Sequence, residues 1–266
     1  MELNSPFKSR IYIIMIVILF LIGIISLFIN VLLSKNNIIN SINLKEVIIN
    51  NKELNECLKN RNISKEALDY IDDKVIEKMS ITIIDKLYKG EENLVDKEDI
   101  LDVIRRSIYK YEGKISDDVY LDVKEDVGII SNKISESINN RENVDRYNTI
   151  RSTVFMLMFS LAFAISFSIL LLMSEKKNFL VYEGTIFIAV SFIILYLKKP
   201  LVNILYNNLD IINLLGINFD KCSKDISSIM CGIIMAIGVV MIFIYIITEG
   251  RHAYRKLRTA YLDKYY

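Results

Sequence analysis

The sequence is poor in the two residues that most often end a helix. It contains 2 Pro and 9 Gly among 266 residues, well below the usual combined share of about 12%. Both residues are unfavourable inside helices, so their scarcity favours few turns and long helices. The composition therefore predicts an all-α chain.

Histidine, cysteine and catalytic motifs are also scarce. The one histidine, His252, excludes H-E-x-x-H zinc chemistry and any metal site built on a histidine pair. The three cysteines, Cys57, Cys222 and Cys231, form no spacing pattern and define no disulfide framework, although a Cys57–Cys222 bridge remains open. The sequence contains no G-x-S-x-G, G-x-G-x-x-G or Walker motif. We therefore expect no cofactor.

A strong net charge is absent as well. The formal charge is +1, which excludes an overall field that would attract nucleic acid. Charged residues nevertheless make up 24% of the chain and hydrophobic residues 52%, with a mean hydropathy of +0.33. The two kinds of residue must therefore be segregated along the sequence.

Four apolar runs carry most of the hydrophobic residues. They cover residues 11–33, 154–173, 179–197 and 229–248. Each has about the 20 residues that a helix needs to cross a hydrocarbon core of about 30 Å. We predict an integral membrane protein with four transmembrane helices, over residues 11–33, 151–173, 179–197 and 229–248.

The first apolar run is expected to be an uncleaved anchor. It follows Lys8 and Arg10, as a secretory signal would, but it is longer than a typical signal core. No Ala-x-Ala cleavage pattern follows it. The lipid bilayer is therefore a partner of the chain from its first helix onward.

The distribution of Lys and Arg predicts the orientation. With the N-terminus inside, the inner flanks at residues 1–10, 174–178 and 249–266 hold nine Lys and Arg, whereas the outer loop at 198–228 holds four. Positive residues are retained on the cytoplasmic side. We expect a multi-pass plasma-membrane protein with both termini cytoplasmic and residues 34–150 outside the cell.

The predicted outer domain shows helical periodicity. Apolar residues recur every three or four positions over residues 44–58, 64–90, 96–113 and 116–138. Four amphipathic helices with short links predict a helical bundle between the first and second spans. Whether its helices continue into those spans stays open. No Gly or Pro interrupts residues 24–89 or 129–183, but asparagines at 36, 37, 139 and 140 are candidate breaks.

The outer domain is acidic, with 19 Lys and Arg against 24 Asp and Glu. Two clusters invite a divalent-cation interpretation, one at Asp69, Asp72, Asp73 and Glu77 and one at Asp117, Asp118, Asp122, Glu125 and Asp126. Neither has EF-hand spacing. We interpret them as solvated helix faces and expect no metal site.

Two segments beside the membrane have amphipathic patterns. After Pro200, an apolar stripe through residues 201–215 predicts a short helix lying in the outer interface. In the C-terminal tail, Arg251, Arg255, Lys256 and Arg258 are candidate contacts to anionic lipid. The alternative for this cluster is an orientation signal alone.

Small residues in two spans predict helix packing. Ser160, Ala164 and Ser168 recur every four residues in the second span, and Gly232 and Ala236 repeat this spacing in the fourth. Small side chains at this spacing allow helix backbones to approach closely in lipid. The packing partner is either this chain, a second copy of it or another membrane protein.

Glu183 is the only Asp, Glu, Lys or Arg inside the four apolar runs. Such residues by default indicate function, here transport or coupling. Glu183 is close to the inner end of its span, however, where a carboxylate can reach water or Lys176 and Lys177, and interfacial placement is favoured. Ser174 and Lys177 match the S-x-x-K spelling without any supporting motif.

One stretch of the outer domain resembles known sequences. Ile83-Ile-Asp-Lys-Leu-Tyr-Lys-Gly90, with residues 95–100 and 104–111, is similar to uncharacterised membrane proteins of low-GC Gram-positive bacteria, whose high Ile, Asn and Lys usage it shares. The resemblance implies a membrane location and assigns no activity.

The order of spans is also similar to ABC permease subunits of the cell-division and macrolide-exporter type. The five-residue loop at 174–178 departs from them, because it is too short to contact an ATPase.

These patterns favour a protein without enzymatic activity. We expect it to act by binding through its outer helical domain, as an envelope sensor, a scaffold or an accessory subunit of a membrane complex. The alternatives are a transporter or permease-like subunit and a membrane enzyme. A membrane enzyme would need a group of polar catalytic residues, and the sequence motifs do not supply one.

Overall fold

The computed structural model describes residues 6–113, 117–174 and 179–265, and these residues form helices without any strand. Four of its helical stretches are long and apolar enough to cross a membrane: Ile13–Leu32, Val123–Ile169, Leu180–Asn208 and Asp220–Glu249. The predicted all-helical class is therefore confirmed, and the structure contains the predicted number of helices apolar enough to cross a membrane.

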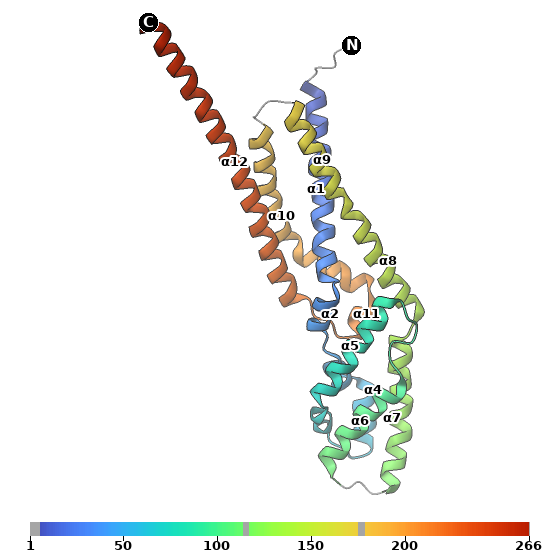
Figure 1. The fold of residues 1–266 in the computed structure, drawn as a ribbon. Helices are drawn as coiled ribbons and strands as arrows, with labels where there is room; N and C mark the ends of the chain where they lie inside the picture. The colour runs from blue at the N-terminus through green and yellow to red at the C-terminus, as the bar shows by residue number, and fades with distance from the viewer. Residues whose placement is uncertain (1–5, 114–116, 175–178, 266) are drawn as a thin grey trace. The chain divides into compact units, whose positions relative to one another are not determined.

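The chain divides into two compact units (Figure 1). Unit 1 comprises Met1–Asn30, Val154–Pro200 and Ser223–Tyr266, and unit 2 comprises Val31–Thr153 and Leu201–Cys222. The chain passes between them four times, and each passage falls inside a helix: α1 (Pro6–Leu32), α8 (Arg141–Leu157), α10 (Phe179–Asn208) or α12 (Asp220–Tyr265). None of these four helices is therefore broken at the border between the units.

Two helix breaks in unit 2 occur at or next to polar residues. Helix α1 ends at Leu32, and α2 (Lys35–Ser41) begins after Ser34. Helix α7 (Asp117–Ile138) is separated from α8 by Asn139 and Asn140. The asparagine break considered from the sequence is therefore present at residues 139–140, whereas the first break lies ahead of Asn36.

The second span contains a break that the sequence did not predict. Helix α8 ends at Leu157, and α9 (Phe159–Ser174) begins after Met158, inside the apolar run. The Ser160 hydroxyl donates a hydrogen bond to the Leu157 carbonyl at 2.7 Å. Such side-chain bonds supply a partner for a backbone carbonyl where a helix bends.

Close helix packing in unit 1 depends on glycine. A methyl group added at Gly184 of α10 would lie 2.7 Å from the Gly238 carbonyl oxygen of α12, and one added at Gly238 would lie 2.6 Å from the Gly184 carbonyl oxygen. A methyl group at Gly23 of α1 would lie 2.4 Å from the Leu161 side chain of α9. The backbones of these helices therefore approach within distances that only glycine permits.

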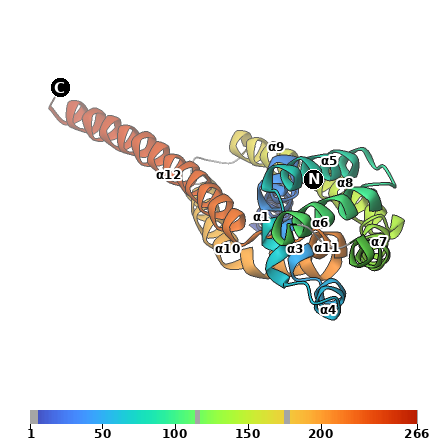
Figure 2. The same cartoon turned by 90° about the horizontal axis from the view of Figure 1, so that it is seen from below.

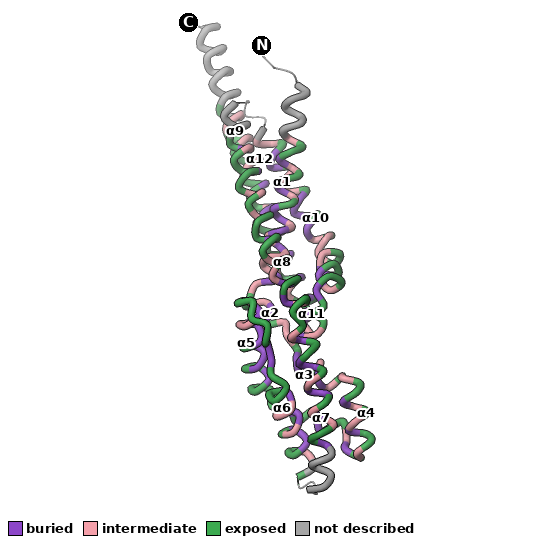
Figure 3. Tube along the Cα trace, turned by 90° about the vertical axis from the view of Figure 1, so that its right-hand side faces the viewer, coloured by how far each residue is buried: buried purple, intermediate pink, exposed green. Residues whose placement is uncertain are grey.

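Unit 2 is a layered set of short helices. Its elements, in addition to α2, α7 and the start of α8, are α3 (Leu44–Ile49), α4 (Lys52–Asn60), the 3-10 helix η1 (Lys65–Tyr70), α5 (Asp73–Lys89), α6 (Lys97–Glu112) and α11 (Asp210–Leu214). Helix α7 contacts α4, α6 and α11, and α5 contacts α2 and α3. Figures 1 and 2 show α6 and α7 side by side, and Figure 3 shows buried positions along the inner sides of these helices.

Two of the four predicted outer helices are confirmed, and two are split. Helices α6 and α7 match the patterns at 96–113 and 116–138. The pattern at 64–90 is divided because the Asp72 side chain accepts a hydrogen bond from the Lys74 amide and starts a new helix, α5. The pattern at 44–58 is divided by Asn51, which caps α4 by accepting from the Leu54 amide. In both places a local capping residue prevails over the apolar periodicity.

Residues 201–219 belong to the core of unit 2. Helix α10 continues through Pro200 to Asn208. Eight apolar side chains of the segment are 0–3% exposed, whereas Ile204 is 54% exposed; the eight are Val202, Leu205, Leu209, Ile211, Ile212, Leu215, Ile217 and Phe219. The Asn43 amide donates to the Gly216 carbonyl at 3.2 Å, and the Asn218 amide donates to the Ser41 carbonyl at 2.8 Å. The structure thus differs from the predicted interfacial helix, because protein rather than lipid covers the apolar stripe.

No disulfide links this segment to the insertion. Cys57 carries a free thiol, so the Cys57–Cys222 bridge is not formed. Burial, followed by the negative charge of Asp126, raises the pKa of the Cys57 thiol. The connection between the two segments therefore rests on packing and hydrogen bonds.

The glycine contacts in unit 1 lead to a first prediction. Gly184→Ala and Gly238→Ala should each destabilise the full-length protein by about 1–3 kcal/mol, because the new methyl group meets backbone that cannot yield locally. Thermal unfolding in detergent measures the effect. Gly232→Ala is the matched control, since nothing lies within 4 Å of its added methyl group. Equal melting temperatures for all three variants would contradict the close approach.

Gly216 leads to a second prediction. Its φ is +63°, and an added methyl group would lie 2.8 Å from the Asn43 carbonyl oxygen and 2.7 Å from Val47 Cγ2. Gly216→Ala should therefore cost more than the roughly 1–2 kcal/mol of left-handed strain alone, and should expose residues 201–222 to protease. Gly90→Ala is the control, because Gly90 also has a positive φ, +74°, but only an ordinary contact at 3.8 Å. Indistinguishable losses in the two variants would show that the contact with Asn43 contributes nothing.

Candidate functional site

Glu183 lies inside unit 1, on the first turns of α10. Its side chain is 4% exposed, although it is only about four residues, or about 6 Å, from the start of the helix. The structure therefore turns the carboxyl group inward rather than toward the interface that its sequence position favoured. Lys176 and Lys177, the cations considered as its neighbours, lie outside the described residues.

The carboxyl group faces a small, largely apolar cavity. The cavity has a volume of ≈ 20 Å³ and is lined from three helices, by Ile13, Ile16 and Phe20 of α1, Ala164, Ile165 and Ser168 of α9, and Ile186 and Phe187 of α10 beside Glu183. The Phe20 and Phe187 rings meet edge to face with centroids 4.4 Å apart. The walls are therefore apolar apart from one hydroxyl group.

That hydroxyl group belongs to Ser168. A hydrogen bond joins its side chain to the Glu183 carboxyl group. The second carboxyl oxygen, Oε2, is buried and has no hydrogen-bond partner among the described residues. A buried polar atom without a partner is rare in proteins and indicates strain, a functional role or a bound water.

The small residues of the second span face the interior of unit 1. Ala164 is 1% exposed and lines the cavity together with Ser168. The Ser160 hydroxyl would lie 2.8 Å from a methyl group at Gly23 of α1. The packing partner of this stripe is therefore α1 of the same chain.

The fourth span differs from this pattern. Gly232 and Ala236 lie on an exposed side of α12, and nothing described approaches within 4 Å of a methyl group at Gly232. Gly238, two residues further along, makes the contact with α10 instead. The sequence analysis did not single out Gly184 and Gly238. Their one sequence signal was the scarcity of glycine, because the chain contains only nine.

The basic tail extends α12 beyond the apolar run. Helix α12 continues to Tyr265, and Arg251 is exposed on it. The side chains of Arg255, Lys256 and Arg258 lie outside the described residues. Lipid contact by this tail stays a prediction.

Unit 2 contains an open cleft between α5 and α6. Its volume is ≈ 250 Å³, and its lining residues are Val75, Lys78, Met79, Thr82, Ile83 and Lys86 of α5, Leu94 and Val95 of the connecting segment, and Asp99, Asp102 and Val103 of α6. Met79, Ile83, Leu94, Val95 and Val103 are buried. The cleft thus has an apolar floor and a charged rim.

The two sides of the rim carry opposite charge. Lys78 and Lys86 lie on the α5 side, and Asp99 and Asp102 lie on the α6 side. Asp102 forms ion pairs with Arg105 at 2.7 Å and Arg106 at 2.6 Å. Lys78 and Lys86 form no ion pair with the part of the chain that the structure describes, so their charges are available to a ligand.

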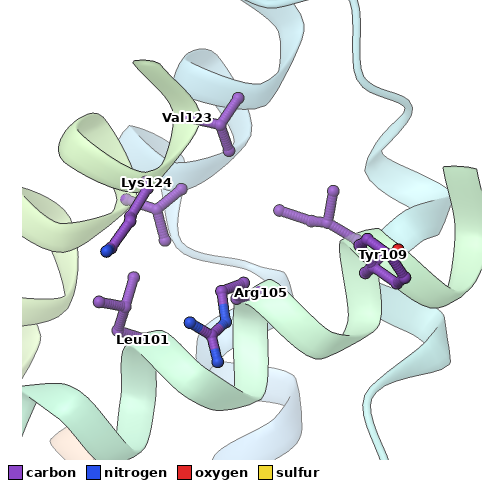
Figure 4. A pocket seen from close by; sticks show the side chains of 7 residues that line it. Leu101, Arg105, Tyr109, Val123 and Lys124 are labelled. Atoms are coloured by element: carbon purple, nitrogen blue, oxygen red, sulfur yellow. The ribbon is translucent and has the colours of Figure 1, made fainter. Parts of the chain in front are cut away.

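A second indentation, between α6 and α7, is too small to bind a ligand (Figure 4). Its volume is ≈ 10 Å³, with Leu101, Arg105, Ile108 and Tyr109 from α6 and Val123, Lys124 and Val127 from α7 around it. This volume is at the limit for one water, and apolar cavities of this kind stay dry. We regard it as a packing defect.

A hydrogen-bonded group holds α5 and α8 to the end of α1. The hydroxyls of Tyr88 and Tyr147 both donate to the Leu33 carbonyl oxygen, Tyr147 at 3.3 Å. The Arg151 guanidinium lies 4.2 Å from the centroid of the Tyr88 ring. Burial raises the pKa of Tyr88, so its hydroxyl keeps its proton and donates at all physiological pH values. This group anchors the backbone where the first helix break occurs.

The acidic clusters do not form a metal site in the described residues. No group of three or more His, Cys, Asp or Glu side chains converges there. Asp72 caps α5, Asp73 pairs with Lys45 at 2.7 Å, and Asp126 pairs with Arg61 at 2.8 Å. The side chains of Asp117, Asp118 and Asp122 lie outside the described residues.

Comparison with protein-family models, with curated proteins and with solved structures gives no match for this chain.

Proposed function

We propose that the chain is a membrane-embedded binding protein whose extracytoplasmic unit 2 recognises a protein segment, as a sensor or as an accessory subunit of a membrane complex. The observation that carries this proposal is the cleft between α5 and α6. In the simplest form of this function, the protein is a scaffold that binds its partner without transmitting a signal.

The chemistry of the cleft suits a protein segment. Its apolar floor offers burial to one or two apolar side chains, and such burial supplies most of the affinity of protein recognition. Lys78 and Lys86 on one rim and Asp99 on the other would orient the segment by charge. Thr82, exposed at the side of the cleft, is open to direct contact.

The connections between the units support a sensor. Each of the four passages between unit 2 and unit 1 lies inside a helix. A helix transmits displacement along its axis because its backbone is hydrogen-bonded from one turn to the next. A change at the cleft therefore has a helical route into the first, third and fourth apolar runs, whereas the route into the second is interrupted at Met158.

Charge along the chain supports placement of unit 2 outside the cell. The N-terminal end of α1 and the C-terminal end of α12 lie at one end of unit 1 (Figure 1). The inner flanks predicted from the sequence are the richer in Lys and Arg. We therefore assign both termini to the cytoplasm of a plasma-membrane protein.

A transporter or permease-like subunit is the second candidate, and buried Glu183 favours it. The cavity at this residue, ≈ 20 Å³, holds no more than about one water. It is too small to be a solute site in this conformation. Binding through unit 2 is therefore the function that we place first.

The orientation leads to a third prediction. In a chain whose cysteines at 57, 222 and 231 are replaced by serine, Ser137→Cys on exposed α7 should react with a membrane-impermeant maleimide on intact cells. Arg251→Cys should react only after the cells are permeabilised, because we assign it to the cytoplasm. Mass-tag gel shifts report both reactions. The opposite result would place unit 2 inside the cell and remove the proposed function.

The cleft leads to a fourth prediction. A photo-reactive phenylalanine analogue at position 82 should form a protein adduct in native membranes, and the same analogue at position 137 should not. The two sites are matched, because each carries an exposed hydroxyl that donates to the carbonyl four residues earlier, Lys78 or Lys133.

The lysine rim supplies the control for this experiment. Lys78→Glu combined with Lys86→Glu should reduce the adduct from position 82 by about tenfold or more, since rim charges of the wrong sign cost of order 1–3 kcal/mol. Mass spectrometry identifies the adduct. An adduct of equal yield at positions 82 and 137, or one indifferent to charge reversal, would contradict recognition at the cleft.

A further inference from the structure

Among the described residues around Glu183 in unit 1, only the Ser168 hydroxyl stabilises a negative charge. The residues that line its cavity from α1, α9 and α10 are isoleucines, phenylalanines, an alanine and Ser168. The fourth helix, α12, approaches the neighbouring residue Gly184 with Gly238 and Ile242. None of these described residues is charged or titratable.

A carboxylate in these surroundings is unfavourable by several kcal/mol. One serine hydroxyl donates a single hydrogen bond, whereas a carboxylate in water accepts several. A neutral carboxylic acid avoids this cost, because it carries no charge and has an O–H donor of its own. The buried and unpartnered oxygen, Oε2, is the atom that would carry this proton into the cavity.

We propose that Glu183 is a proton-binding site of the membrane unit, in which the neutral acid and Ser168 share the cavity with one water molecule. The cavity of ≈ 20 Å³ exceeds the roughly 10–15 Å³ that one water requires. This water accepts a hydrogen bond from the acid O–H at Oε2 and donates hydrogen bonds to the other carboxyl oxygen of Glu183 and to the Ser168 hydroxyl. Every polar atom of the site then has a partner.

The site couples proton occupancy to helix packing. Loss of the proton leaves a charge between α1, α9 and α10, and water must enter to solvate it. Deprotonation therefore weakens the packing of these helices, so the folded protein should be less stable at high pH than at low pH. This inference does not depend on the binding function proposed for unit 2.

Dicyclohexylcarbodiimide, an apolar reagent specific for protonated carboxyl groups, tests the site. The acid adds across one C=N bond: its oxygen bonds to the carbodiimide carbon, its proton goes to nitrogen, and rearrangement to an N-acylurea leaves the full reagent mass on the residue. We expect Glu183 of the full-length protein in detergent to be labelled at about pH 8. Peptide mass spectrometry locates the label.

Exposed carboxyl groups of the same chain serve as internal controls. At about pH 8 a solvated Glu, with a pKa near 4.3, is protonated in fewer than about one molecule in a thousand. Glu77 and Glu136, both exposed, should therefore carry at least about a hundredfold less label than Glu183. A water-soluble carbodiimide should leave Glu183 unlabelled, because its carboxyl group is buried among apolar side chains.

Glu183→Gln supplies the second measurement. This variant keeps the shape of the neutral acid, so it should fold, lose the label and melt at a temperature that changes less between about pH 6 and pH 8.5 than that of the native protein. The comparison of melting curves stands even where labelling is slow.

Three outcomes would overturn the proposal. The first is no label at Glu183 together with identical pH profiles for the native protein and Glu183→Gln. The second is labelling by the water-soluble reagent, which would show that the carboxyl group is accessible from water. The third is protection from labelling by Na⁺ or K⁺ at constant ionic strength, which would assign the site to a metal cation.

Discussion

The organisation of this protein depends on the free-energy cost of leaving backbone or charged groups without partners in hydrocarbon. Unit 1 meets this constraint with helices, whose amides and carbonyls bond internally. Its exceptions are few and locally compensated. The break at Met158 is accompanied by a hydrogen bond from Ser160 to the Leu157 carbonyl, and buried Glu183 is bonded to Ser168. Pro200, which removes one amide donor from α10, lies where the chain leaves unit 1.

The membrane helices pack closely because several of their contact positions are glycines, which have no side chain. Lipid is as apolar as a leucine side chain, so burial alone does not drive helices together in a bilayer. Gly23 lets α1 approach α9, and Gly184 and Gly238 bring the backbones of α10 and α12 together. The larger apolar side chains, such as Phe163, Phe192 and Phe243, point outward, where lipid solvates them. Unit 2 shows the opposite arrangement, with its apolar side chains inside.

The sequence predicted the features that depend on length and periodicity. The four apolar runs had the length of membrane spans, and the stripes of α6 and α7 were regular enough to place both helices. Rotation about a helix axis was harder to predict. The four-residue spacing of Gly232 and Ala236 matched a packing motif, yet Gly238 faces α10. The depth of Glu183 favoured the interface, whereas its direction depends on three helices that meet only in the folded chain.

The sequence pattern also failed to predict which residues cap helices and which apolar stripe the protein covers. Asn51 and Asp72 each start a helix in the middle of an apolar stripe, because a side-chain cap competes with continuation. The stripe through residues 201–215 fits a lipid surface or a protein surface equally well. Only the structure shows that unit 2 covers it. The α5–α6 cleft, formed by residues from two helices and their link, likewise had no signature in the sequence.

The inclusion of residues 201–222 in unit 2 has a consequence for biogenesis. Ribosomes deliver the chain from the N-terminus, so residues 31–153 reach their compartment well before the segment that completes their core. Until α10 has been inserted and its C-terminal part has emerged, the surfaces later covered by Leu209, Ile212 and Phe219 stay unprotected. Completion of the core of unit 2 therefore waits for translation of the third apolar helix, and during that interval the exposed apolar surface is accessible to a chaperone.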